Sequence, residues 1–271
     1  MKLSAVAAAL AIAGGLGFSG QALADALGTI TDVTMSFPDA TRTHTIDMDP
    51  GFNGYAGLAS GSETNADWDF LPGVGDNGFA AWCLEPMEYL QSPATYDVNT
   101  LEDAPQQGSG LTMGSRNGVA GSTRADDMRR LFGGVYDFAT DTFSDVTVAG
   151  LSDRDLRTAF QVAIWEIANE TDDAGAAGYS YDVTSGGFKR GSGGGDNWTN
   201  VASQANTWLG NLESYGAETG LLALVNTTNN KQDFIVKVVP IPAAAWLFGS
   251  ALIGTIAIGR RKTKAKAQTV A

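Results

Sequence analysis

The sequence has only one cysteine and one histidine among its 271 residues. A disulfide within the chain is therefore impossible, and zinc centres built from several Cys and His ligands are excluded. The single histidine, His44, lies in a polar run at residues 41–45, far along the chain from Cys83. Motifs of serine hydrolases, phosphate-binding loops and calcium loops are also missing. We therefore expect neither a hydrolase nor a bound metal or cofactor.

Basic residues are scarce. The chain has 30 Asp and Glu but 17 Lys and Arg, and Lys2 and five residues of the C-terminal tail account for six of these basic residues. The segment 25–238 therefore carries 11 basic and 30 acidic residues, a formal charge of −19. Such a surface repels nucleic acid and anionic lipid, so we expect neither as a partner.

The N-terminus has the pattern of a secretory signal peptide. Lys2 is followed by an Ala-rich apolar run at residues 3–18, and Ala22 and Ala24 form a small-x-small cleavage site. Signal peptidases recognise this order of features. The sequence predicts a signal peptide at residues 1–24 and export of the remainder.

The C-terminus has a second targeting pattern at residues 239–271. Residues 241–259 are close to the ~20 apolar residues that span a bilayer, and the basic residues after them would stay in the cytoplasm. The segment resembles the PEP-CTERM sorting signal of Gram-negative bacteria, with Ile241 in place of the Glu of the family name. The residues that carry this motif are Val239, Pro240, Pro242, Arg260, Arg261 and Lys262. The resemblance implies a transmembrane sorting helix, transient anchoring in the inner membrane, processing by an exosortase-like enzyme, and a final place on the cell surface or in a biofilm matrix.

Between these signals, residues 25–238 predict one α+β domain, with a strand-rich sandwich or barrel-like core and a small helical lobe. Short apolar runs bounded by Gly, Asp and Thr indicate strands, and apolar residues at helical spacing indicate helices. Ser152 and Asp155 have the spacing of a helix-starting capping box. The expected strands include 30–37, 79–84 and 233–239, the helices are 124–136, 152–170 and 203–212, and the loops are 51–75, 106–121 and 185–196.

Cys83 is unusual because exported proteins normally use cysteines in pairs. An inert buried thiol, an intermolecular disulfide and a cysteine with other chemistry all remain open. Gln161 is the second unusual residue, because it lies beside the apolar stripe of the 152–170 helix, between Phe160 and Val162. A buried amide is unfavourable unless hydrogen bonds satisfy it.

At these two residues the chain resembles the thioester domains of bacterial surface adhesins. In that family, an aromatic-Cys-hydrophobic strand motif joins a Φ-Q-x-x-Φ-W helix motif, where Φ is hydrophobic. The second motif matches at residues 160–165, and the first matches at residues 82–84, with Trp82 where Tyr, Phe or Leu is usual. The resemblance implies a thioester cross-link between Cys83 and Gln161. It also implies a pocket formed by Trp82, Leu84, Phe160, Ile164 and Trp165.

A thioester would be attacked once by an amine or hydroxyl of a surface or matrix target, including a polysaccharide, so the resemblance implies a covalent adhesin and no turnover enzyme. Glu85 and Glu166 follow the two motifs and are candidates for proton transfer. The alternative is a non-covalent structural or carbohydrate-binding matrix protein with a free buried cysteine. In that case Trp68, Trp198 and Trp208 are candidates for stacking on sugars.

Overall fold

The computed structural model describes residues 29–36, 44–49, 52–56, 58–62, 78–86, 88, 90, 93–105, 112–114, 122–170, 181–190, 197–228 and 231–237. The chain divides into two compact units, Met1–Val238 and Val239–Ala271. The predicted signal peptide and the predicted sorting signal both lie outside the described residues. Among the helices that are described, none is long and apolar enough to cross a membrane.

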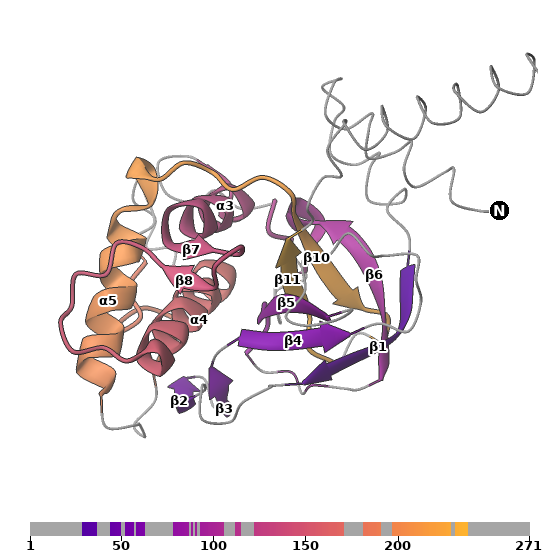
Figure 1. Ribbon diagram of the computed structural model, residues 1–271, viewed down its shortest axis with the longest axis horizontal. Helices are drawn as coiled ribbons and strands as arrows, with labels where there is room; N and C mark the ends of the chain where they lie inside the picture. Colours follow the sequence, from indigo (N-terminus) through magenta and orange to yellow (C-terminus); the bar gives the residue numbers. More distant parts are fainter. Residues whose placement is uncertain are drawn as a thin grey trace, which may run out of the picture. The chain divides into compact units, whose positions relative to one another are not determined.

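Six antiparallel strands of the first unit close into a barrel (Figure 1). Around the barrel their order is β1-β4-β5-β11-β10-β6. The alternation of apolar and polar residues along β6 and β10 places one face of each strand inside. The strands are β1 (Thr29–Ser36), β4 (Leu58–Ser62), β5 (Gly78–Cys83), β6 (Ala94–Thr100), β10 (Leu221–Asn226) and β11 (Phe234–Lys237). The prediction of an α+β fold with a barrel-like core is confirmed.

The register of the barrel assigns neighbouring residues of β5 to opposite faces. Cys83 lies opposite Phe234, and Phe234 in turn lies opposite Leu224. Directly paired residues point to the same side of a sheet, and successive residues point to opposite sides. Cys83 and Phe234 therefore share one face of the sheet, while Trp82 points to the other.

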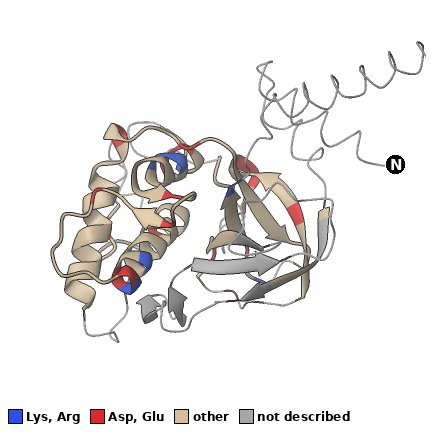
Figure 2. Ribbon diagram, in the orientation of Figure 1, with Lys and Arg blue, Asp and Glu red and all other residues tan. Residues whose placement is uncertain are grey.

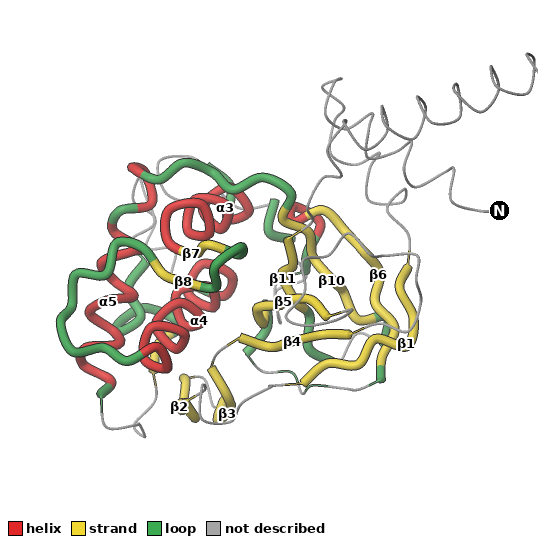
Figure 3. The backbone as a smooth tube through the Cα atoms, viewed as in Figure 1, coloured by secondary structure: helices red, strands yellow, loops and turns green. Residues whose placement is uncertain are grey.

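Three helices gather beside the barrel (Figure 3). They are α3 (Arg124–Val135), α4 (Asp153–Asn169) and α5 (Trp198–Gly210). Ser152 and Asp155 form the predicted capping box at the start of α4, and Thr123 and Asp126 form a second one at the start of α3. Almost every residue of α4 after its first turn is buried. The helix is thus enclosed on several sides, which goes beyond the single apolar stripe expected from the sequence.

Shorter elements complete the described part of the chain. A small sheet of order β3-β2-β9 stands apart from the barrel, and a two-stranded hairpin, β7-β8, follows α3 directly. These elements are β2 (His44–Asp49), β3 (Phe52–Ala56), β9 (Lys189–Arg190), β7 (Tyr136–Asp137), β8 (Thr142–Phe143) and the 3-10 turns η3 (Leu101–Asp103) and η5 (Leu212–Ser214).

The structure differs from the sequence predictions at three places. The segment 51–75, predicted as a loop, contains strands β3 and β4, because glycine in short strands obscures the alternating pattern. Similarly, β9 falls within the predicted loop 185–196. The helix expected at 203–212 begins five residues earlier, at Trp198. Its N-cap, Asn197, makes no capping hydrogen bond from its side chain, so no local signal marks the start.

Acidic and basic residues lie side by side at one end of α4 (Figure 2). There the buried Arg157 pairs with Asp141 at 2.7 Å and with Asp153 at 2.9 Å. The Asp141 pair joins α4 to the β7-β8 hairpin, since Asp141 also accepts a hydrogen bond from the Tyr136 hydroxyl at 2.8 Å. The hairpin and the helix are therefore held in one fixed arrangement.

Candidate functional site

The side chain of Gln161 is bound to the backbone of Cys83. The backbone N–H of Cys83 donates to Gln161 Oε1 at 3.1 Å, and Gln161 Nε2 donates to the Cys83 carbonyl oxygen at 2.7 Å. The two residues are 78 positions apart in sequence. The structure therefore brings together the two residues that the sequence singled out.

The edge of β5 explains why the amide fits at this place. Leu84 N–H donates to the carbonyl oxygen of Asp233 on the β11 side. Successive residues of a strand direct their N–H and C=O groups to opposite sides, so those of Cys83 point away from β11, towards β4. The last pair between β4 and β5 is Leu58 with Trp82. The Gln161 amide thus supplies the donor and the acceptor that a strand neighbour of Cys83 would supply.

The site is dry. Gln161 is fully buried and Cys83 is only 1% exposed. Burial raises the pKa of the Cys83 thiol well above its ordinary value, so the thiol is protonated in the resting protein. An isolated thiolate is strongly disfavoured here, so any reaction of the sulfur needs both a near-attack geometry and a group that stabilises negative charge.

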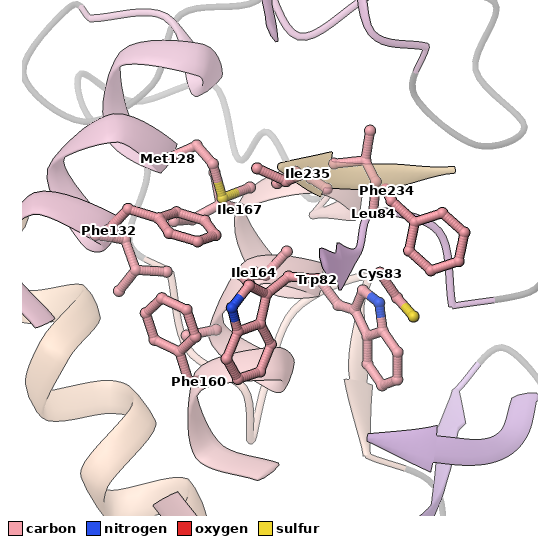
Figure 4. Close-up of a cluster of buried hydrophobic side chains, with 14 of the residues drawn as sticks. Trp82, Cys83, Leu84, Met128, Phe132, Phe160, Ile164, Ile167, Phe234 and Ile235 are labelled. Carbon is pink, nitrogen blue, oxygen red and sulfur yellow. The ribbon is translucent and has the colours of Figure 1, made fainter. Parts of the chain in front are cut away.

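A layer of aromatic rings lies on the helix side of β5 (Figure 4). The Trp82 ring meets Phe160 edge-on with centroids 4.8 Å apart, and it meets Tyr136 edge-on at 5.2 Å. Figure 4 shows Trp82 on the side of Phe160 and Cys83 on the side of Phe234. Trp82 therefore fixes the helical lobe against the barrel, while Cys83 occupies the opposite face of the strand.

The remaining predicted pocket residues are Leu84, Ile164 and Trp165, and all three are buried in the same core. Leu84 directly follows the last residue of β5, Cys83, and the other two belong to the helix that carries Gln161. The predicted sorting residues Val239, Pro240, Pro242, Arg260, Arg261 and Lys262 lie outside the described residues.

The two glutamates next to the motifs have different surroundings. Glu166 accepts a hydrogen bond from Asp182 N–H at 2.8 Å, in the segment that follows α4. Burial raises the pKa of Glu166 to about 9. Burial together with Asp233 and Glu88 raises the pKa of Glu85 to about 8. Burial is also the main cause that raises the pKa of Asp233 to about 7. The carboxyls of Glu85 and Asp233 thus lie together at the end of β5, whereas Glu166 belongs to the helical lobe.

Trp208 does not form a sugar-stacking face. It is fully buried, and its Nε1 donates to the carbonyl oxygens of Ser144 and Asp145 at 3.2 and 3.0 Å. Trp198 is partly buried against the core, and Trp68 lies outside the described residues. In the part of the chain that the structure describes, no group of three His, Cys, Asp or Glu residues is arranged to hold a metal ion.

Sequence reasoning missed three residues at the Cys83 end of the barrel: Tyr96, Asn226 and Asp233. Asn226 N–H donates to Asp233 Oδ1 at 2.7 Å, and Tyr96 lies directly opposite Asn226 in the register of β6 and β10. The alternation of Tyr96 and Val98 between polar residues was the available signal for an inward-facing tyrosine.

A search with protein-family models finds no match, and a search of curated proteins finds none either. Solved structures of similar fold include the N-terminal thioester domain of fibronectin-binding protein SfbI from Streptococcus pyogenes. That likeness has 12% identity, covers 78% of this chain and 95% of the other, and has a TM-score of 0.43.

Two further solved structures are similar to the chain. The N-terminal domain of the Streptococcus pyogenes pilus tip adhesin Cpa has 11% identity, covers 78% of this chain and 95% of its own, and has a TM-score of 0.41. The N-terminal thioester domain of a surface protein from Clostridium perfringens has 9% identity, with coverages of 67% and 89% and a TM-score of 0.35. At TM-scores this low, the likeness carries no conclusion about function, which has to come from the residues of this chain.

Proposed function

We propose that Cys83 and Gln161 form an internal thioester and that the protein is a covalent adhesin of the cell surface or extracellular matrix. The observation that supports this proposal is the pair of hydrogen bonds between the Gln161 amide and the Cys83 backbone, inside a dry core. The Gln161 amide thereby lies against the backbone of the residue whose side chain carries the sulfur. Positioning of this kind removes much of the entropic barrier to an intramolecular reaction.

The hydrogen bonds also have the correct polarity for the reaction. The thiol sulfur attacks the Gln161 Cδ atom, and the carbonyl oxygen becomes negative in the tetrahedral intermediate. The Cys83 N–H, which donates to that oxygen at 3.1 Å, stabilises the developing charge. The C–N bond then breaks, and Nε2 leaves as ammonia with the proton that the thiol gave up.

The product is an acyl thioester that a nucleophile can open. An amine or hydroxyl of a surface or matrix molecule bonds to Gln161 Cδ, the C–S bond breaks, and the Cys83 thiol is released. Each chain reacts once, so the protein acts as a reactive attachment group and performs no turnover. The target class is an amine or a hydroxyl, including those of a matrix polysaccharide.

Export and sorting belong to the same proposal. The signal peptide at residues 1–24 and the PEP-CTERM-like segment at 239–271 support export, brief anchoring in the inner membrane and processing by an exosortase-like enzyme. The acidic character of residues 25–238 suits a soluble domain displayed outside the cell.

The intact mass of the full exported chain tests the proposal. A thioester gives a mass lower by one ammonia, and mild methylamine treatment then adds one methylamine and exposes one titratable thiol. A mass equal to that of the unmodified chain, with a free thiol from the start, overturns the proposal. Gln161 would in that case only supply hydrogen bonds to the edge of β5. The protein would then be a non-covalent matrix protein.

Gln204 provides a matched control for the key glutamine. It is also fully buried and helical, and its side chain also binds backbone groups of a distant segment, at Asp145, Thr147 and Val148. We expect Gln161→Glu and Cys83→Ser to abolish the ammonia-deficient species and Gln204→Ala to leave its yield unchanged in the folded protein.

A further inference from the structure

Tyr96 carries a buried hydroxyl whose own proton has no acceptor among the described residues. The side chain of Asn226 is its hydrogen-bonding neighbour and lowers the pKa of Tyr96, as a bond donated to the phenol oxygen does. An unsatisfied buried hydroxyl destabilises a fold by about 1–3 kcal/mol. A phenylalanine would fill the same space without that penalty, so packing alone does not account for the tyrosine.

The register of the barrel places Tyr96 on the same face as Cys83. Cys83 pairs with Phe234, Phe234 pairs with Leu224, and Tyr96 pairs with Asn226, two residues along β10 from Leu224. Residues two apart in a strand share a face, as do directly paired residues. The rings of Tyr96 and Phe234 are in contact edge-on, with centroids 5.9 Å apart. Strands β11 and β10 lie between β5 and β6 on one side of the barrel, and β4 and β1 on the other. Cys83 and Tyr96 therefore face each other across the barrel interior, and both lie beside Phe234.

The groups that shift the pKa of Tyr96 agree with this placement. Burial, with smaller contributions from Asp233 and Cys83, raises the pKa of Tyr96 to about 12, against the hydrogen bond with Asn226, which lowers it. The hydroxyl thus senses charge on the Cys83 sulfur and keeps its own proton at neutral pH. It is a hydrogen-bond donor without an acceptor, and the nearby sulfur is an acceptor without a donor whenever it is negative.

We propose that the Tyr96 hydroxyl is the hydrogen-bond donor that stabilises negative charge on the Cys83 sulfur when the C–S bond of the thioester forms and when it breaks. This inference rests on the proposed thioester and adds a functional residue on the opposite side of β5 from the aromatic layer. During formation, the hydroxyl donates to the sulfur as the thiol loses the proton that finally leaves with ammonia. During attack by an amine, it donates to the departing sulfur, which then keeps one proton of the incoming amine.

Tyr96→Phe is the decisive variant, because it keeps the ring and removes only the hydroxyl oxygen, whose hydrogen-bonding neighbour is the Asn226 side chain. Chains isolated in the unfolded state, with free thiol and amide, are refolded, and the loss of ammonia is followed by intact mass. Methylamine incorporation is then measured on the fraction that has formed the thioester. We expect both rates to fall at least about tenfold, since one lost donor to a developing charge has effects of this size or larger, while thermal stability stays equal or rises.

Tyr136→Phe is the matched control. Tyr136 is also buried and its ring lies against Trp82, but its hydroxyl donates to Asp141 at 2.8 Å, on the helical side of β5. We expect this variant to be less stable than wild type and to form and open the thioester at the wild-type rate. Equal slowing by both variants would overturn the inference, because the effect would then follow from packing.

A second substitution tests the inference if Tyr96→Phe does not fold. Incorporation of 3,5-difluorotyrosine at position 96 keeps the ring and makes the phenol more acidic, so methylamine should open the thioester faster. Wild-type rates in Tyr96→Phe or in the fluorinated protein would overturn the role of Tyr96 and leave the thioester intact. Absence of the ammonia-deficient mass in wild type would instead overturn the proposed function.

Discussion

Gln161 and Gln204 are two fully buried glutamines on neighbouring helices, yet their surroundings prepare them for different tasks. The oxygen of Gln204 accepts from two backbone N–H groups, of Thr147 and Val148, at 2.9 and 3.0 Å, and its nitrogen donates to Asp145. That side chain connects α5 to the loop at residues 144–148. Gln161 makes both of its hydrogen bonds to a single residue, and that residue carries the only thiol of the chain.

Under the proposed function, burial and hydrogen bonding do not by themselves make a glutamine reactive. Both amides are buried and hydrogen-bonded to backbone groups, and only Gln161 is bound to the residue that carries the thiol. The Gln204 amide has no possible reaction partner among the described residues that bind it. The predictions below use this contrast, and they run from the largest expected effect to the smallest.

Loss of the cross-link should be the largest effect on stability. A bond between residues 78 positions apart restricts the unfolded chain, and loop-closure entropy gives roughly 4 kcal/mol for a loop of this length. Methylamine-treated wild type should therefore unfold at a lower temperature than untreated wild type, as measured by calorimetry. Cys83→Ser should not respond to methylamine at all, and a response would contradict the assignment.

Gln204→Ala should lower stability by about 2–3 kcal/mol, because two backbone N–H groups and one carbonyl lose a partner. Denaturant unfolding measures this change. The mass of the folded variant should still be low by one ammonia. If the thioester yield falls in proportion to stability in this variant, the contrast between the two glutamines fails.

Rising pH should lower the stability of the protein through two buried carboxyls at the end of β5. The pKa values of Glu85 and Asp233 are raised to about 8 and about 7. Their stabilising contribution is full below the unfolded-state values near pH 4 and is lost as pH rises through the folded-state values. Each carboxyl should contribute a decline of up to about 1.4 kcal/mol per pH unit between about pH 4.5 and 7. Unfolding of Glu85→Gln should show a shallower decline, whereas the exposed Glu213→Gln should match wild type.

Ser152→Ala should have the smallest effect. Ser152 accepts a hydrogen bond from Asp155 N–H at the start of the helix that carries Gln161, and such caps contribute about 1 kcal/mol. Thermal unfolding should detect this loss, with no change in thioester yield. A large fall in yield would mean that the position of Gln161 depends on the helix end more than on its bonds to Cys83.

Some features of this structure could be predicted from the sequence, and others could not. The capping box at Ser152 and the apolar spacing after it are local signals, so the boundaries of α4 were predictable. Cys83 and Gln161 stood out as residues that contradict their surroundings, one a single thiol and the other an amide in an apolar helix. Both features are visible without knowledge of the fold.

The features that could not be predicted depend on contacts between segments that are distant in the sequence. The position of Tyr96 opposite Asn226 could not be predicted, because it depends on pairing with β10, which starts more than a hundred residues later in the chain. Asp233 resembles an ordinary turn residue until Asn226 N–H and Leu84 N–H are found to bind it. Strands β3 and β4 were hidden because glycine and serine dominate a region that pairs only with other strands.

Closure of the barrel has a consequence for the place in a matrix that the proposed function gives the protein. Each of the six strands has a neighbour on both sides, so the barrel has no edge strand to which another copy could add a strand. If the proposed function holds, neighbouring barrels in a layer would not join strand to strand. The number of unspent thioesters would then set the number of covalent connections in that layer.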